Sequence, residues 1–246
     1  LKEFSNFTFY QMDIENLEEL EQVFQRHTFD KVINLAARAG VRYSMSNPHV
    51  HMSTNATSTL NILTMILKHG ISGMVLASTS SLYAGQPMPF TENLPVNTPI
   101  SPYAASKKAA EVMAYSYHHL YDLSICILRY FTVYGPAGRP DMSIFQFIKK
   151  IDDGVPITLF GDGTQTRDFT YVGDIAAGTV KATNFQGYDI INLGGGRRPV
   201  SINYLIDKIE RSLGKKAKIN SQPFHKADIK DTSANISKAK ELLNWE

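Results

Sequence analysis

The sequence predicts an α/β fold with a doubly wound parallel sheet. Short apolar runs typical of buried strands alternate with longer runs whose apolar residues recur at helical spacing. Two of these strands run directly into hydroxyl-bearing residues, and a third runs into a pair of alanines. Alternating strands and helices favour a parallel sheet, and the ligands of such sheets lie beyond the carboxyl ends of the strands.

The composition is that of an ordinary globular protein. The chain has 246 residues, of which 43% are hydrophobic and 20% charged, and its formal net charge is +2. That charge is too small to indicate steering toward nucleic acid or a membrane. No run approaches the roughly 18 apolar residues of a membrane span, and with no recognisable leader we expect a cytoplasmic location. The single cysteine, Cys126, lies in an apolar run, so we expect a buried thiol and no disulfide or metal site.

The first half of the chain supplies most of the predicted sheet. Residues 17–26 have helical spacing, with Leu20 and Phe24 on one face. Residues 55–67 have the same spacing, and Gly70 follows as a helix stop. The sequence also predicts a helix over 101–120 and strands over 7–12, 31–37, 73–78 and 123–131.

The chain changes character after Gly135-Pro136, where prolines and glycines separate shorter elements. Here the sequence predicts a helix from Asp174, a strand over 189–193, and helices over 202–213 and 237–243. We expect two parts. Residues 1–136 with about 170–194 form the sheet domain, and about 137–169 with 195–246 form a smaller α+β part that faces the substrate.

Tyr103 and Lys107 form a candidate acid–base pair on the predicted helix over 101–120. Residues four apart share a helix face, so the lysine ammonium can approach the phenol. Lowering the pKa of a tyrosine by about three units needs about 4 kcal/mol. One cation at about 4 Å supplies that at an effective dielectric near 20. The same spacing also occurs on solvated helices, so the neighbouring residues decide its meaning.

Those neighbours lie at predicted strand ends. Thr79 to Ser81 follow the strand over 73–78, Thr132 follows the strand over 123–131, and Ala36-Ala37 end a third strand. Because the carboxyl ends of parallel strands meet at one edge, we expect these residues to lie together near Tyr103.

Four motifs in this order resemble the extended short-chain dehydrogenase/reductases that act on nucleotide sugars. They are Ser78 to Tyr83, Tyr103 to Lys107, Arg129 to Pro136 and Arg167 to Val172. Within that family, Ala36 to Ser44 and Gly138 to Met142 resemble the UDP-glucuronate 4-epimerases. The resemblance implies a Rossmann-type sheet, NAD as cofactor and a UDP-sugar as substrate.

The resemblance also implies roles for single residues. Tyr103 would be the base, Thr79 would bond the reacting sugar hydroxyl, and Lys107 would hold the nicotinamide ribose. Cofactor-binding residues would be Asp13, Ile14, Leu35, Ala36, Ala37, Arg38, Asn55, Tyr103, Lys107, Tyr130, Phe131 and Val133. Substrate-binding residues would be Thr79, Ser80, Ser81, Thr132, Arg139 and Arg167, with Arg167 on the diphosphate. From the residues alone, Asp13 also fits a turn, Asn55 a helix cap, and Tyr130 and Phe131 the core.

The residues after Thr79 favour one reaction of that family. Related 4,6-dehydratases carry Asp and Glu there, and a decarboxylase carries Glu, whereas Ser80 and Ser81 cannot act as acid or base near pH 7. A 4-keto sugar should therefore survive and take the hydride back on its other face. With Arg139 available for a carboxylate, we expect 4-epimerisation of UDP-glucuronate to UDP-galacturonate. The alternatives are a 4-epimerase of UDP-glucose or UDP-N-acetylglucosamine, and an inactive relic that only binds a nucleotide sugar.

The chain departs from the family at its start. The glycine-rich strand–turn–helix that receives the cofactor pyrophosphate is not in the sequence, and the resemblance places about 50 residues, nearly two strand–helix units, before Leu1. We therefore expect residues 7–12, if they form a strand, to lie apart from residues 31–35 or to pair with them. We also expect that residues 1–246 alone neither bind NAD tightly nor epimerise a sugar. For the complete enzyme we expect a homodimer through the helices of Tyr103 and Asn55.

Overall fold

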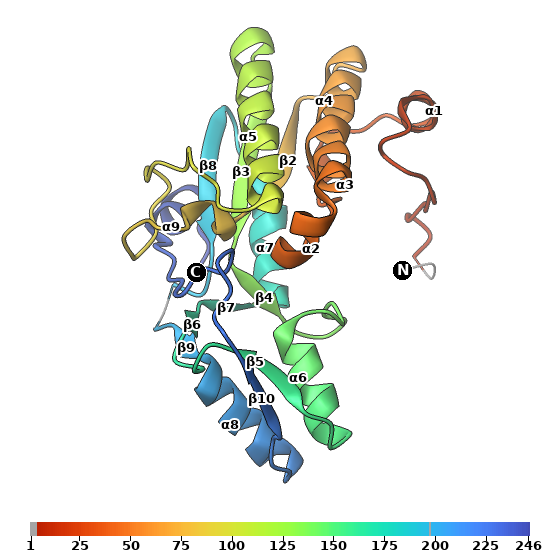
Figure 1. Ribbon diagram of the computed structural model, residues 1–246. Coiled ribbons are helices and arrows are strands. Elements are labelled where there is room, and N and C mark those ends of the chain that lie inside the picture. Colours follow the sequence, from red (N-terminus) through yellow and green to blue (C-terminus); the bar gives the residue numbers. More distant parts are fainter. Residues whose placement is uncertain (1–3, 197) are drawn as a thin grey trace.

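The sheet is parallel and covered by helices on both faces, as the sequence predicts. The computed structural model describes residues 4–196 and 198–246. Its main sheet has the strand order β1-β2-β3-β8, and neighbouring strands pair in parallel. The bounds of these strands are Val32–Asn34, Gly73–Thr79, Ser124–Tyr130 and Tyr188–Leu193. Figure 1 shows α4 and α5 on one side of the sheet and α7 on the other.

Alternating side chains of the strands build a core on each face. Met74 and Leu76 of β2 pack with Leu20 of α1 (Leu17–Arg26) and with apolar residues of α4 (Ser58–Lys68) and α5 (Pro102–Tyr121). Val75 and Cys126 point the other way, toward α7 (Val172–Ala182) and α9 (Ser237–Leu243). Burial raises the pKa of the Cys126 thiol to about 12, which confirms the buried structural cysteine.

A smaller group of elements lies beyond the carboxyl ends of the main strands (Figure 1). Its core joins α6 (Ser143–Asp152), β5 (Ile157–Phe160) and α8 (Ile202–Leu213). Strand β5 pairs with β10, β4 with β7, and β6 with β9. The remaining bounds are β4 Thr132–Tyr134, β6 Thr166–Arg167, β7 Phe169–Tyr171, β9 Val200–Ser201, β10 Ile219–Gln222, α2 Val41–Ser46, α3 Pro48–Met52, the π-helical turn η1 Ser53–Thr57 and the 3-10 turn η2 Ser80–Tyr83.

Three details differ from the expectation. Residues 7–12 form no strand, and β1 is an edge strand that pairs only with β2 among the described residues. The helix expected over 55–67 begins earlier, as the π-helical turn η1 that contains Asn55. Helix α9 packs against β8 and α7 of the main sheet, although its segment was expected in the smaller part. The division of the chain into two parts stays a prediction.

Candidate active site

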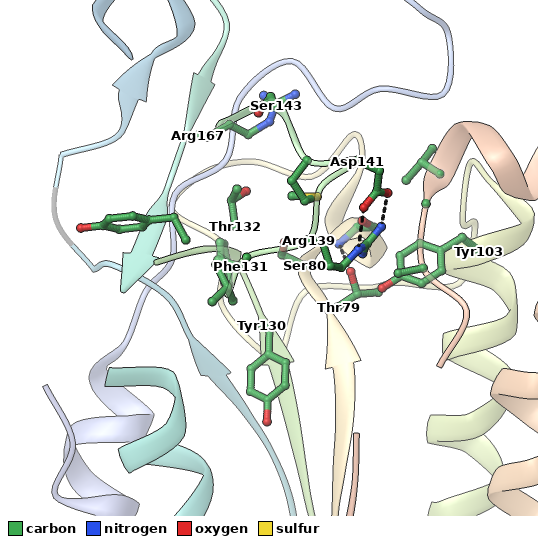
Figure 2. Close-up of a pocket in the computed structure, with 18 of the residues that line it drawn as sticks. Thr79, Ser80, Tyr103, Tyr130, Phe131, Thr132, Arg139, Asp141, Ser143 and Arg167 are labelled. Atoms are coloured by element: carbon green, nitrogen blue, oxygen red, sulfur yellow. Dashed lines mark hydrogen bonds and ion pairs between the residues drawn. The ribbon is translucent and has the colours of Figure 1, made fainter. Parts of the chain in front are cut away.

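A pocket of about 740 Å³ opens at the carboxyl ends of β2 and β3. Figure 2 shows the side chains that surround it. Ten residues proposed from the sequence line it, namely Thr79, Ser80, Ser81, Tyr103, Tyr130, Phe131, Thr132, Val133, Arg139 and Arg167. The structure thus brings the predicted base and every predicted substrate residue to one cavity, from four stretches of chain.

Tyr103 is held by the start of α5. Ser101 caps this helix, since its hydroxyl accepts a hydrogen bond from the backbone N–H of Ala104, and Pro102 fits the first helical position. The Tyr103 ring meets the edge of the His51 ring, with 6.2 Å between centroids. Burial raises the pKa of the Tyr103 phenol, while the Thr79 hydroxyl and the charge of Arg139 oppose that rise. The expected lowering of this pKa by Lys107 is therefore not what the chain's own residues produce.

Thr79 ends β2 and turns the chain into η2. Its side-chain oxygen accepts a 3.1 Å hydrogen bond from the backbone N–H of Ser81, which caps the 3-10 turn. This turn brings the hydroxyls of Ser80 and Ser81 to the pocket. Figure 2 shows Thr79 beside Tyr103.

Lys107 lies one helical turn beyond Tyr103 and is 4% exposed. Burial lowers the pKa of its ammonium to about 8, and the charge of Glu111 opposes that change. The loop of residues 35–38 follows β1 and carries exposed side chains, two of them alanines. The buried Lys107 ammonium is suited to bind ribose hydroxyls, and the two alanines of the loop leave room for a flat ring. Both features fit a cofactor such as NAD.

Asn55 links that loop to the helix of Tyr103. Its side-chain oxygen accepts from the backbone N–H of Arg38 at 2.8 Å, and its amide donates to the Arg38 carbonyl at 2.9 Å and to Ser106 Oγ at 2.8 Å. Asn55 is therefore occupied in positioning the loop, and it caps no α-helix.

Other predicted cofactor residues also have structural partners. Asp13 forms a turn, because its carboxylate accepts a 3.0 Å hydrogen bond from the N–H of Glu15, and Ile14 packs against the core on the α4 side. The hydroxyls of Tyr130 and Thr179 lie 2.8 Å apart, and Phe131 is buried beside Tyr83. Tyr130 and Phe131 thus serve both the core and the pocket wall. Asp13, Ile14, Leu35, Ala36, Ala37, Arg38, Asn55 and Lys107 lie outside the set that lines the pocket.

The two predicted substrate arginines differ in their partners. Arg139 is exposed and forms a bidentate ion pair with Asp141, at 3.0 Å from Nε to Oδ1 and 2.5 Å from Nη2 to Oδ2 (Figure 2). Arg167 is half-buried and donates to the carbonyls of Thr166 and Lys230. Burial lowers the pKa of Arg167, and the charges of Asp228 and Asp231 oppose that change.

The residues alone did not single out Arg42. It pairs with Asp228 at 2.5 Å, and its guanidinium carbon lies 3.5 Å from the centre of the Phe160 ring. The pair joins positions 186 residues apart in the sequence at the pocket wall, a separation that no local pattern reveals.

Two features are absent from the described ranges, 4–196 and 198–246. No helix there is long and apolar enough to cross a membrane. No three His, Cys, Asp or Glu side chains in those ranges are grouped to hold a metal ion.

The chain is similar to known proteins over its whole length. The UDP-glucuronate 4-epimerase of Thermodesulfobacterium geofontis is 59% identical over 246 residues, which is 100% of this chain and 76% of that one. The crystal structure of UDP-glucuronic acid 4-epimerase from Bacillus cereus with UDP-glucuronic acid and NAD superposes with a TM-score of 0.93 at 37% identity, covering 100% of this chain and 78% of that one. UDP-glucose 4-epimerase from Thermotoga maritima, with UDP-glucose, gives a TM-score of 0.91 at 29% identity, covering 99% and 80%. The model of the NAD dependent epimerase/dehydratase family matches residues 2–194, and the chain belongs to that family.

Proposed function

We propose that this protein catalyses the NAD-dependent 4-epimerisation of UDP-glucuronate to UDP-galacturonate through a transient 4-keto sugar. One observation carries the proposal. The pocket sets Tyr103 beside Thr79, while Ser80 and Ser81 stand where a dehydratase or decarboxylase would need a carboxyl group. A relative with the name UDP-glucuronate 4-epimerase, 59% identical, supports this choice.

In the proposed mechanism, the chain binds the sugar and moves one proton. Tyr103 accepts the proton of the C4 hydroxyl, which Thr79 orients, and later returns it. Lys107 would hold the ribose of NAD, and Arg38 with its neighbours would line the cofactor. NAD, when bound there, would supply the hydride acceptor and donor that inversion at C4 requires. Because burial raises the pKa of the Tyr103 phenol, the positive charges of Lys107 and of the cofactor would have to favour the phenolate when the proton is taken.

Carboxylate recognition would rest on neutral donors and one arginine. Ser80, Ser81 and Thr132 line the pocket with hydroxyls, and Arg139 adds a planar fork suited to a carboxylate. The Asp141 carboxylate already occupies that fork in the way a uronate would. Arg167, which also lines the pocket, is proposed to meet the diphosphate.

Neutral UDP-hexoses are the second candidate substrates. The superposition on UDP-glucose 4-epimerase from Thermotoga maritima favours them, since its TM-score is 0.91. An assay of the complete enzyme with UDP-glucuronate, UDP-glucose and UDP-N-acetylglucosamine separates the candidates, with products resolved by chromatography. We expect an equilibrium mixture of UDP-glucuronate and UDP-galacturonate. Conversion of a neutral sugar alone, or no conversion by protein that holds NAD, would contradict the proposal.

A homodimer through α5 and α4 is also proposed. These neighbouring helices cover the sheet on one side (Figure 1) and carry exposed apolar side chains, among them Leu67, Val112, Tyr115 and Tyr121. Grouped apolar residues on an outer face are typical of a subunit interface. The cytoplasmic location stays a prediction from the sequence.

A further inference from the structure

A fully buried ion pair lies behind the candidate site. Glu111 of α5 and Arg129 of β3 are each 1% exposed. Arg129 donates to both carboxylate oxygens of Glu111, at 2.9 Å from Nε and 2.7 Å from Nη2, and Ser78 Oγ donates to the same carboxylate at 2.6 Å. Arg129 also donates to the Tyr83 hydroxyl at 2.9 Å, which in turn donates to Asn192 Oδ1 at 2.8 Å. The network thus ties α5 to β2, β3, η2 and β8.

Such a pair is a poor source of stability. Removing two charges from water costs several kcal/mol for each ion, and well-packed apolar residues of the same size are often as stable. A buried pair therefore calls for a role beyond holding the fold together. Its place on α5 supplies one, because Glu111 lies four residues after Lys107 and eight after Tyr103, so the three side chains share one helix face.

We propose that Glu111 is a positioning residue, whose carboxylate fixes the pitch of α5 over the sheet and keeps a negative charge one helical turn beyond Lys107. The Glu111 charge acts on Lys107, whose ammonium form is disfavoured by burial. Burial lowers the pKa of Lys107 to about 8, and Glu111 opposes this change. Without Glu111, more of the lysine would be uncharged at neutral pH. The neutral amine could not supply the cation that Tyr103 needs, a step that rests on the function proposed above.

Other titratable groups lie on the elements packed around this face. They include Tyr103 and Lys108 of α5, Tyr43 of α2, His51 of α3, Tyr83 of η2, Arg129 of β3 and Tyr188 of β8, whose pKa is raised by burial and further by the charge of Glu111. Lys108 lies 3.6 Å from Glu111, and Arg129 is held by Glu111 itself. Among these groups, Glu111 is the carboxylate and the one whose charge favours the ammonium form of Lys107.

Two variants separate charge from packing. Glu111→Gln keeps the shape and removes the charge, whereas Glu111→Asp shortens the side chain and keeps the charge. The measurement is an NMR titration of the purified protein labelled with ¹³C-lysine, with the Lys107 signal identified by its loss in Lys107→Arg. We expect the titration midpoint of Lys107 to lie near pH 8 in the wild type. It should lie about one pH unit lower in Glu111→Gln and stay nearly unchanged in Glu111→Asp. An unchanged midpoint in Glu111→Gln, or an equal fall in both variants, would overturn the proposal.

The pH profile of kcat provides the functional readout. Since the reaction needs Lys107 charged, activity should be lost as pH rises through the pKa of Lys107, and this loss should begin at lower pH in Glu111→Gln. If that variant does not fold, Glu111→Gln/Arg129→Met is compared with Arg129→Met, and the difference between their Lys107 midpoints gives the effect of the Glu111 charge. If the wild type does not convert UDP-glucuronate, the proposed function fails, while the titration without substrate still decides the role of Glu111.

Discussion

At the scale of the residue, burial shifts the pKa values of two candidate site residues away from what their proposed roles require. The Tyr103 phenol is to accept a proton, yet burial raises its pKa. The Lys107 ammonium is to stay charged, yet burial lowers its pKa. Both tasks become possible when the two groups, a bound cofactor and Glu111 act together, because each cation near a phenol favours the phenolate. The proposed acid–base chemistry would therefore depend on several side chains together.

The first prediction concerns Tyr103. Tyr103→Phe removes the phenolic oxygen and leaves the ring against His51. Turnover should fall by about 10²–10⁴-fold, which is the usual contribution of a proton transfer, and the melting curve should stay close to that of the wild type. Steady-state rates with UDP-glucuronate and a thermal melt check this. A variant that kept a tenth of the wild-type rate would show that another group takes the proton.

The second prediction concerns the fork of Arg139. Arg139 and Asp141 are 46% and 61% exposed, and exposed ion pairs contribute about 0–1 kcal/mol. A uronate carboxylate can therefore displace Asp141 at small cost. Asp141→Asn should lower KM for UDP-glucuronate, and Arg139→Leu should reduce kcat/KM by about tenfold or more, both without effect on UDP-glucose. Equal effects on the two sugars would remove Arg139 from carboxylate recognition.

At the scale of the element, one helix, α5, carries three of the residues proposed to act in the reaction. Its capped N-terminus fixes Tyr103, Lys107 follows one turn later, and Glu111 joins the helix to two strands. The helix packs on η1 and α3 as well, so Asn55 and His51 reach the same face. A helix with this many polar side chains on its buried face gives up stability for function.

That cost leads to the third prediction. Between the folded pKa of Lys107, about 8, and its ordinary value of 10.5, the unfolded chain binds more protons than the folded chain. The wild type should therefore gain stability relative to Lys107→Met as pH rises through this window. Below it, Lys107→Met should melt higher, by about 2–4 °C for each kcal/mol recovered, and should lack activity. Melts at several pH values test this. A destabilised Lys107→Met at neutral pH would show that the buried lysine helps the fold.

At the scale of the whole molecule, local patterns predicted most of the elements, and long-range pairings accounted for the failures. Apolar spacing located α1 to the residue, and the helices expected over 202–213 and near 237–243 are α8 and α9. The failed strand at residues 7–12 had the right composition, but a strand also needs a neighbour, which composition does not specify.

The candidate site shows the same limit. The positions of Thr79 and Thr132 were predictable, because both follow parallel strands whose carboxyl ends meet at one edge of the sheet. Sequence patterns did not reveal the Arg42–Asp228 pair or the Arg129–Glu111 pair, because their partners come from distant segments. Asp13 and Asn55 were ambiguous in the sequence for a related reason. Short polar side chains satisfy a turn or a neighbouring loop as readily as they bind a ligand.

The last prediction concerns assembly. Val112 and Tyr115 of α5 are 54% and 53% exposed, and a stable interface buries about 800 Å² on each partner, which two adjacent long helices can provide. Sedimentation equilibrium of the complete enzyme should give twice the mass of its single chain. Val112→Glu/Tyr115→Glu should sediment as a monomer, because paired carboxylates do not tolerate burial. Val180→Glu, on α7 across the sheet and 62% exposed, is the matched control and should remain dimeric. If the double variant stayed dimeric, or the control dissociated, the interface would lie on another face.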